Sequence, residues 1–311
     1  MMNKLIRTFV ATVLTVGMFM GLFQPVGQAA DKLQVVTTFY PVYFLASEIA
    51  GEHADVKMLI QGGEDAHDYE ASAKDVAMIQ DADLFIYQDD EMEHFVPAVL
   101  KSLDSDKVKV AKATQGLELL RGDDHDHDHD HEDHDHAHHH EFDPHTWLDP
   151  IFYSQQAENI ANALSTADPD HETDYMARKD ELVKRLEELN QKFESELAHR
   201  QDRTIVVQHA AFGYLAHAYN LEQEAITSIF STQEPSAAAI AQVQDFVKEH
   251  NVKVIYVEPT LNDTTAKTVA EATGAKLLPL RTLESLSKED EEAGKDYFDL
   301  MEENLQSLMN E

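Results

Sequence analysis

The sequence predicts an α/β protein of two lobes, each built on a parallel sheet flanked by helices, joined by one long rigid linker helix. Short β-rich runs alternate with helical segments before residue 120, and the same alternation returns after residue 200. Such alternation is typical of parallel sheets with helices on their faces. We therefore expect an N-terminal lobe over 30–171, a linker helix over 172–200 and a C-terminal lobe over 201–311.

The strands expected in the first lobe are short and rich in β-branched or aromatic residues, and they cover 33–38, 56–60, 84–87 and 108–111. A helix is expected over the amphipathic stretch 43–51. A second helix is expected to begin after Ser72 and to end near Ala82, because Ser72 and Asp75 have the spacing of a capping box.

In the second lobe, the expected strands cover 204–208, 225–229, 252–258 and 276–280. The expected helices cover 210–219, 235–249, 263–273 and 288–309. Pro235 is typical of the first turn of a helix. Gly274 marks the end of the third helix, since glycine is common directly after a helix C-terminus.

The linker helix is predicted from apolar side chains spaced by three or four residues, namely Leu182, Leu186, Leu189, Phe193 and Leu197. The segment 172–200 contains no Gly or Pro, and as a helix it would be about 44 Å long. A solvated surface helix is the alternative, but a rigid spine between the lobes explains this length better.

Residues 1–29 are expected to form a cleaved signal peptide. Lys4 and Arg7 precede an uncharged apolar run over 8–23, and Gly27-Gln28-Ala29 has the small-x-small pattern of a signal-peptidase site. A helix over 8–23 would span about 24 Å, which is short for a bilayer core of roughly 30 Å. We therefore expect an exported protein that works outside the cytoplasm.

The composition argues against several classes of function. The chain has 24 Lys and Arg against 59 Asp and Glu, a formal net charge of −35. Nonspecific binding to nucleic acid or to an anionic membrane needs a basic face, so neither partner is expected. The sequence has no cysteine, which excludes disulfides, cysteine-type zinc sites and cysteine nucleophiles.

Histidine is concentrated in one acidic segment, 123–141, which we call the His-rich segment. Its histidines are His125, His127, His129, His131, His134, His136, His138, His139 and His140. Because the only apolar residue within it is Ala137, the segment is expected to be disordered. Neutral imidazole is a common ligand for transition metals, so we expect an auxiliary metal-collecting loop without fixed geometry. A charged solubilising insertion is the alternative.

Other residues that can bind a metal lie near the ends of the expected strands or beside the His-rich segment. They are His67, His145, His209, Glu258 and Glu284. In open parallel sheets, ligands bind beyond the carboxyl ends of the strands. We therefore expect a site between the lobes that gathers these side chains.

Seven short blocks occur in order along nearly all of residues 30–311. They are 37–41 (TTFYP), 66–70 (AHDYE), 81–84 (DADL), 143–150 (DPHTWLDP), 208–214 (QHAAFGY), 233–236 (QEPS) and 283–286 (LESL). The Asp-Pro-His-x-Trp-Leu block, in order with the others, is the most specific. On these blocks the chain resembles the extracytoplasmic metal-binding proteins of ABC importers, in the branch that carries zinc and manganese. The likeness is strongest to the Gram-positive zinc-binding proteins of the ZnuA and AdcA type.

This resemblance implies two lobes with parallel four-stranded sheets and one metal ion between them. It implies His67 and His145 as ligands from the first lobe, with His209 and Glu284 from the second. Manganese-binding members have a carboxylate at the position of His209. Three imidazoles and one carboxylate suit Zn²⁺ and not Mn²⁺, so zinc is the expected ion. The fourth ligand stays open between Glu284, Glu258 and water.

The surroundings of the expected site give three further expectations. Asp143 or Asp149 is expected to orient a ligating imidazole, and the sequence leaves open which of them does so. Trp147 is expected to be a packing anchor for the segment that bears His145. Gram-positive relatives usually carry a lipidated cysteine after the signal peptide; this sequence has none, so the resemblance does not predict membrane attachment.

The expected function is high-affinity capture of zinc by a monomer and its delivery to the membrane permease of an ABC importer, without catalysis. One alternative is a secreted zinc hydrolase with Glu258 as general base. Against it, the sequence has no His-Glu-x-x-His motif, and a fourth protein ligand leaves no place for water. The other alternative is a surface adhesin or a passive metal buffer. A buffer would need only the His-rich segment and not the ordered ligands.

Overall fold

The computed structural model describes residues 32–122, 142–228 and 235–310. The expected signal peptide and the His-rich segment therefore lie outside the described residues. Contacts between residues gather Leu33–Glu311 into one compact unit. The division of this unit at residues 172 and 200 stays a prediction. Within the described ranges, no helix is both long and apolar enough to cross a membrane.

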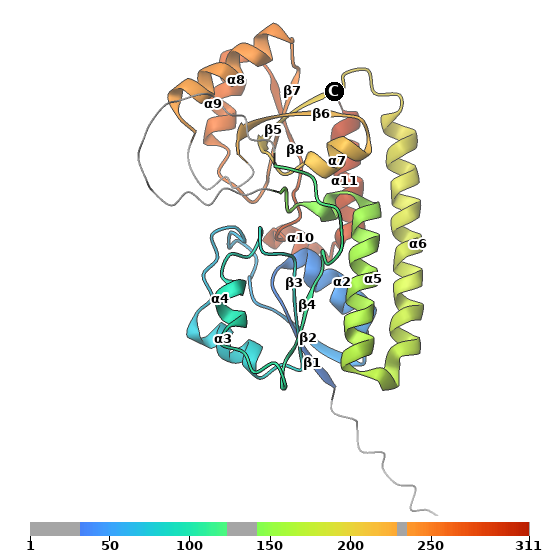
Figure 1. Cartoon of the computed structure of the whole chain (residues 1–311). Helices are drawn as coiled ribbons and strands as arrows, with labels where there is room; N and C mark the ends of the chain where they lie inside the picture. Colours follow the sequence, from blue (N-terminus) through green and yellow to red (C-terminus); the bar gives the residue numbers. More distant parts are fainter. Residues whose placement is uncertain (1–31, 123–141, 229–234, 311) are drawn as a thin grey trace, which may run out of the picture. The chain divides into compact units, whose positions relative to one another are not determined.

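Two separate four-stranded sheets form the framework (Figure 1), and every pair of neighbouring strands is parallel. The first sheet has the order β2-β1-β3-β4, with β1 Leu33–Thr37, β2 Ala54–Met58, β3 Leu84–Tyr87 and β4 Lys109–Lys112. The second has the order β6-β5-β7-β8, with β5 Thr204–His209, β6 Glu222–Thr227, β7 Val254–Val257 and β8 Lys276–Pro279. The expected fold class of two parallel four-stranded sheets is confirmed.

Helices connect the strands and cover both sheets. In the first half of the chain they are α2 Tyr40–Ala50, α3 Ala73–Gln80, α4 Val96–Leu100, the short η1 Thr146–Leu148, α5 Pro150–Ala167 and η2 Pro169–His171. In the second half they are α6 Glu172–Leu197, α7 Gly213–Ala218, α8 Ala237–Glu249, α9 Thr264–Thr273, α10 Lys288–Ala293 and α11 Tyr297–Met309.

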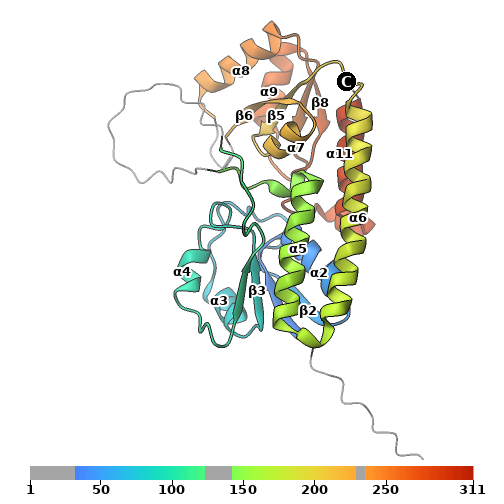
Figure 2. The same cartoon turned by 45° about the vertical axis from the view of Figure 1, so that its right-hand side comes forward.

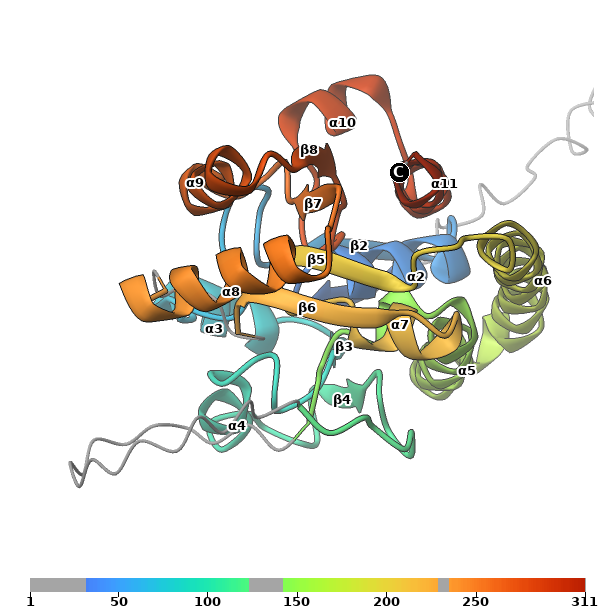
Figure 3. The same ribbon diagram turned by 90° about the horizontal axis from the view of Figure 1, so that it is seen from above.

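The second sheet shows how strand alternation places its helices. Val206 and Ile255 point to one face, where they pack with Val243 of α8 and Val269 of α9. Ile205 and its alternating neighbours point to the other face and join the main core. Successive side chains of a strand point to opposite faces, so a fully apolar strand needs helices on both sides. Figure 3 shows α8 and α9 on one side of this sheet and α7 and α11 on the other.

The long helix α6 lies against α5 along much of its length (Figure 2). Its buried side chains form the expected stripe, extended toward the N-terminus by Tyr175 and Lys179. The helix ends at Leu197, three residues before the predicted end. The expected long helix is thus confirmed, and its apolar stripe packs on α5 and α2.

Two helical predictions were incomplete. The 18-residue helix α5 was missed, although Asp149 caps it by accepting hydrogen bonds from the N–H groups of Ile151 and Phe152, with Pro150 in its first turn. The expected closing helix is two helices. Gly294 ends α10 with a φ of 67°, and a capping box between Asp296 and Asp299 starts α11.

Candidate metal centre

Three imidazoles and one carboxylate come together at the carboxyl ends of strands from both sheets. Each of His67, His145, His209 and Glu284 offers one ligand atom, and these four atoms lie within 4.8 Å of one another. In the part of the chain that the structure describes, no other group of three or more His, Asp or Glu side chains converges in this way.

Each of these residues lies at the end of a strand or in a loop that follows one. His67 lies in the loop between β2 and α3, where its backbone N–H donates to Asp65 Oδ1 at 2.9 Å. His145 directly precedes η1, His209 is the last residue of β5, and Glu284 follows β8. Because all strands are parallel, β5 and β8 end at the same edge of their sheet, as expected from the sequence.

The three rings form a nearly equilateral triangle. Their centroids are 5.2 Å apart for His67 and His145, 5.5 Å for His67 and His209, and 5.2 Å for His145 and His209. Glu284 Oε1 lies 3.2 Å from His145 Nε2 and 3.5 Å from His67 Nε2. Ligand atoms of a tetrahedral zinc ion are about 3.3 Å apart, given metal–ligand distances of about 2.0–2.1 Å. The distances from Glu284 to His145 and to His67 are therefore close to the spacing that one small ion needs.

Asp143 orients His145. Its Oδ1 atom lies 2.7 Å from His145 Nδ1 and also accepts the backbone N–H of His145 at 2.9 Å. A carboxylate at Nδ1 holds a ring proton on that nitrogen, so Nε2 is the nitrogen that faces Glu284 and that would bind an ion. The choice between Asp143 and Asp149 is thus decided by the fold, because Asp149 caps α5 instead.

Glu258 orients His209 and lies behind the ring. Its Oε1 atom is 3.1 Å from His209 Nδ1, while its Oε2 atom accepts the hydroxyl hydrogen of Thr282 at 2.7 Å. Glu258 is absent from the converging group, and Glu284 belongs to it. The geometry therefore favours Glu284 over Glu258 as the carboxylate that faces an ion.

Gln88, which the sequence analysis missed, holds the segment around His145. Its side-chain amide donates to the carbonyl oxygen of Pro144 at 2.9 Å and to the hydroxyl of Thr146 at 2.7 Å. The Gln88 amide oxygen accepts from Gln156 of α5 at 2.7 Å. Its position directly after a buried strand was the available signal, but nothing in the sequence pairs it with residues so far along the chain.

Trp147 anchors the same segment, as expected. Its ring is fully buried and meets Phe39 edge to face at 5.1 Å. Its indole N–H donates to the carbonyl oxygen of Thr282. The next residue, Leu283, is buried with a φ of 62°, a left-handed conformation that costs a bulky residue of order 1–2 kcal/mol. This turn lies between the contact with Trp147 and the ligand candidate Glu284.

Burial and neighbouring charges have opposite effects on the pKa values of His145, His209 and Glu284. Burial lowers the pKa of His145, but the carboxylates of Asp143 and Glu284 outweigh it and raise the pKa to about 10. Burial likewise opposes protonation of His209, and Glu258 raises its pKa. Burial would raise the pKa of Glu284, yet the neighbouring imidazoles, with His67 foremost, hold it well below its usual range. Without an ion, the site therefore holds protons that a metal would displace.

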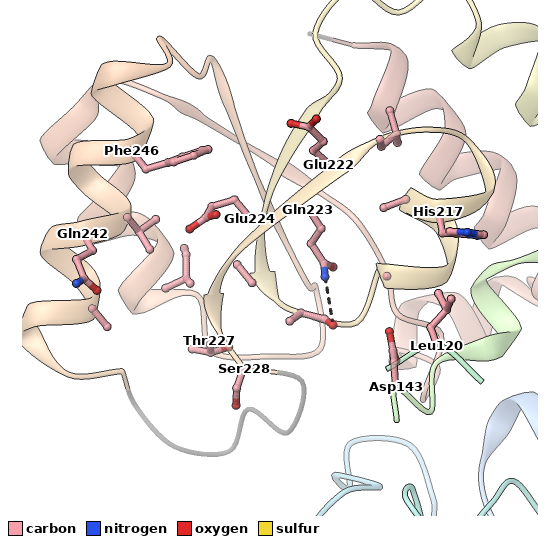
Figure 4. A pocket seen from close by; sticks show the side chains of 18 of the residues that line it. Leu120, Asp143, His217, Glu222, Gln223, Glu224, Thr227, Ser228, Gln242 and Phe246 are labelled. Atoms are coloured by element: carbon pink, nitrogen blue, oxygen red, sulfur yellow. Dashed lines mark hydrogen bonds between the residues drawn. The ribbon is translucent and has the colours of Figure 1, made fainter. Parts of the chain in front are cut away.

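The remaining histidine near this region, His217, is not part of the converging group. His217 is exposed on α7 and lines a cavity of about 1000 Å³ between α7, β6 and α8, with Glu222 and Phe246 among its other walls (Figure 4). The nine histidines of the His-rich segment lie outside the described residues.

Two parallel sheets with three imidazoles and a carboxylate gathered at the carboxyl ends of their strands are features of a metal-binding protein. The family model of ZnuA, the periplasmic component A of a zinc-uptake complex, matches residues 35–311. The chain belongs to this family. The members of this family are components of a zinc-uptake complex and not enzymes. The expectation that the protein is not an enzyme is therefore confirmed, and the hydrolase alternative is set aside.

Individual relatives agree with this assignment. The chain is 42% identical to the zinc-binding lipoprotein AdcA of Streptococcus pneumoniae over 281 residues, which is 90% of this chain and 56% of AdcA. It thus spans little more than half the length of that relative. It is 41% identical over 278 residues to the high-affinity zinc uptake system protein ZnuA of Bacillus subtilis, covering 89% of this chain and 87% of that protein.

Solved structures show the same fold. The Zn(II)-bound ZnuA-like domain of Streptococcus pneumoniae AdcA has a TM-score of 0.77 at 38% identity and covers 89% of this chain and 98% of that chain. The laminin-binding protein Lmb of Streptococcus agalactiae, described as having adhesin and metal-transporting activity, has a TM-score of 0.77 at 35% identity, with coverages of 89% and 99%.

Proposed function

We propose that this protein binds one Zn²⁺ with His67, His145, His209 and Glu284, outside the cytoplasm, and delivers the ion as a monomer to the membrane permease of an ABC importer. The convergence of the four donor atoms within 4.8 Å is the observation that carries this proposal. Membership of a zinc-uptake family and the zinc-bound relatives support it.

The donor set favours zinc over manganese. Three imidazole nitrogens and one carboxylate oxygen suit the tetrahedral geometry of Zn²⁺, while Mn²⁺ prefers more ligands and more oxygen among them. The carboxylates of Asp143 and Glu258 lie behind the rings, where they fix the orientation of His145 and His209 and add negative charge near the cation.

A metal titration tests the proposed site. Residues 30–311 without 123–141 would be titrated with Zn²⁺ and Mn²⁺ in competition with a chromophoric chelator. We expect one tight zinc site, weak manganese binding, and loss of the tight site in His67→Ala and His209→Ala. The exposed His217 provides the matched control, since His217→Ala removes an imidazole without touching the cluster. A chain without a tight site after the deletion would favour the passive-buffer function.

Delivery to a permease is tested in cells. A strain that lacks this gene would receive the wild-type gene or the His209→Ala variant, and zinc uptake would be measured with and without the cognate permease. Uptake that needs both the intact site and the permease supports delivery. Uptake that is restored equally by the variant would contradict it.

The His-rich segment is proposed to collect zinc when the ion is scarce. The segment ends only four residues before His145, which brings many imidazoles close in sequence to a ligand candidate. Deletion of 123–141 is expected to lower uptake at limiting zinc and to leave uptake at ample zinc unchanged. Unchanged uptake at limiting zinc would remove this role.

Adhesion is a second candidate function. The observation in its favour is the similarity to Lmb, which is described as both an adhesin and a metal transporter. Binding of the purified chain to immobilised laminin would be compared for wild type and for His209→Ala. Saturable binding supports adhesion, and binding no higher than that to albumin excludes it for laminin.

A further inference from the structure

Gly213 lies against the carboxylate that orients His145. A Cβ atom placed on Gly213 would be less than 3.0 Å from Asp143 Oδ2, a distance that real Cβ atoms essentially never show, and 3.6 Å from Asp143 Cγ. The Asp143 carboxylate therefore occupies the space that any side chain at position 213 would need. Figure 4 shows Asp143 beside the start of α7, the helix that begins at Gly213.

The backbone at Gly213 does not itself require glycine. Unlike Gly274 and Gly294, Gly213 does not have a left-handed φ. It is the first residue of the helix α7. Glycine at this position leaves room for the carboxylate of Asp143.

The neighbouring residue fixes the same segment. The hydroxyl of Tyr214 donates to the carbonyl oxygen of Asp143 at 3.0 Å and accepts the backbone N–H of Leu120 at 2.9 Å. Asp143 is thus held through its main chain by Tyr214, and its carboxylate packs on Gly213. Both contacts come from the segment that closely follows His209. The segment that carries the His209 imidazole therefore positions Asp143, the residue that orients His145.

We infer that Gly213 is a positioning residue of the metal centre, an inference that rests on the proposed zinc-binding function. By lacking a side chain, it lets Asp143 hold the Nδ1–H of His145, so that Nε2 faces the ion. Any side chain at position 213 would displace the carboxylate and leave the imidazole of His145 free to turn.

A double-mutant cycle tests this inference in the full chain. Zinc affinity would be measured by chelator competition for wild type, Gly213→Ala, Asp143→Ala and the double variant, with His217→Ala on the same helix as control. Loss of a partner that orients a ligand typically lowers metal affinity 10- to 100-fold. We expect that loss for each single variant, a double variant no weaker than Asp143→Ala alone, and an unchanged control.

Spectroscopy separates positioning from a general loss of structure. The visible bands of bound Co²⁺ report ligand geometry, and they are expected to change in the same way in Gly213→Ala and Asp143→Ala. Nitrogen NMR of His145 in the zinc-loaded protein should show the metal on Nε2 and the proton on Nδ1 in wild type, and a mixture of the two arrangements in both variants.

Several outcomes would overturn the inference. Wild-type affinity in Gly213→Ala or in Asp143→Ala would do so, as would losses that simply add in the double variant. If Gly213→Ala fails to fold, Asp143→Ala must restore folding in the double variant, because it removes the clash. Failure of the wild-type chain to bind zinc tightly would instead refute the proposed function, so the two results are distinguishable.

Discussion

The indole N–H of Trp147 donates a hydrogen bond of 2.6 Å to the carbonyl oxygen of Thr282, 135 residues further along the chain. The hydroxyl of Thr282 in turn donates to Glu258, which orients His209. One path of hydrogen bonds thus joins the segment after His145 to the carboxylate behind His209. The ligand geometry of each half of the molecule therefore depends on the other half.

Trp147→Phe tests this path. Phenylalanine keeps an aromatic ring against Phe39 but removes the N–H, so the carbonyl of Thr282 loses a buried hydrogen bond. We expect the free energy of unfolding to fall by about 1–3 kcal/mol in denaturant titrations. Trp147→Leu should cost more, because it also loses ring packing. Equal stability of Trp147→Phe and wild type would show that the bond contributes nothing net.

Glu258→Gln tests the partner of His209. Glutamine keeps the size of the side chain but removes the negative charge that holds the proton on His209 Nδ1. Zinc affinity is expected to fall about tenfold or more, as measured by chelator competition. Glu222→Gln, at an exposed position on β6, is the control and should leave affinity unchanged. A larger loss in the control than in Glu258→Gln would contradict this role.

Zinc affinity is expected to rise with pH. With a pKa of about 10, His145 carries a proton at neutral pH in the ion-free protein, held there by Asp143 and Glu284. Zinc must displace that proton, and each displaced proton makes affinity rise about tenfold per pH unit below the pKa. Chelator competition at pH 6, 7 and 8 measures this slope. Affinity that stays constant over this range would mean that His145 binds zinc without losing a proton.

Glu93 predicts a pH dependence of stability that does not involve the metal centre. Burial, reinforced by the charge of Asp89, raises the pKa of Glu93 from 4.5 to about 8. The folded chain then binds a proton that the unfolded chain releases. The stability from this proton is complete below about pH 4.5 and is lost as the pH rises through about 8.

Glu93→Gln removes that titration. The free energy of unfolding of wild type, relative to this variant, should fall between pH 5 and pH 8 by up to roughly 1.4 kcal/mol per pH unit. Denaturant titrations of both chains across this range give the difference between their free energies of unfolding. Contributions from groups that the two chains share cancel in this difference. Glu52→Gln, at an exposed position, is the control variant and is measured in the same way. A flat difference for Glu93→Gln would mean that Glu93 stays ionised in the fold.

Much of the architecture could be predicted because its signals are local. Strand and helix periodicity gave all eight strands to within three residues, and the apolar stripe gave α6. Ser72 and Gly274 marked helix ends through caps that involve only neighbouring residues. Helix α5 was missed although its cap is local, and the break at Gly294 was read as continuous helix.

The sequence by itself determined that His67, His145, His209, Glu258 and Glu284 were the candidates, from their places near strand ends or beside the His-rich segment. The resemblance to a zinc-binding family singled out His67, His145, His209 and Glu284 among them. Only the tertiary structure decided their partners. Asp143 rather than Asp149 reaches His145, and Glu258 lies behind His209 rather than among the converging donors. Such choices depend on contacts between segments far apart in the chain, such as Asp143 with Gly213, whose distances no local pattern encodes.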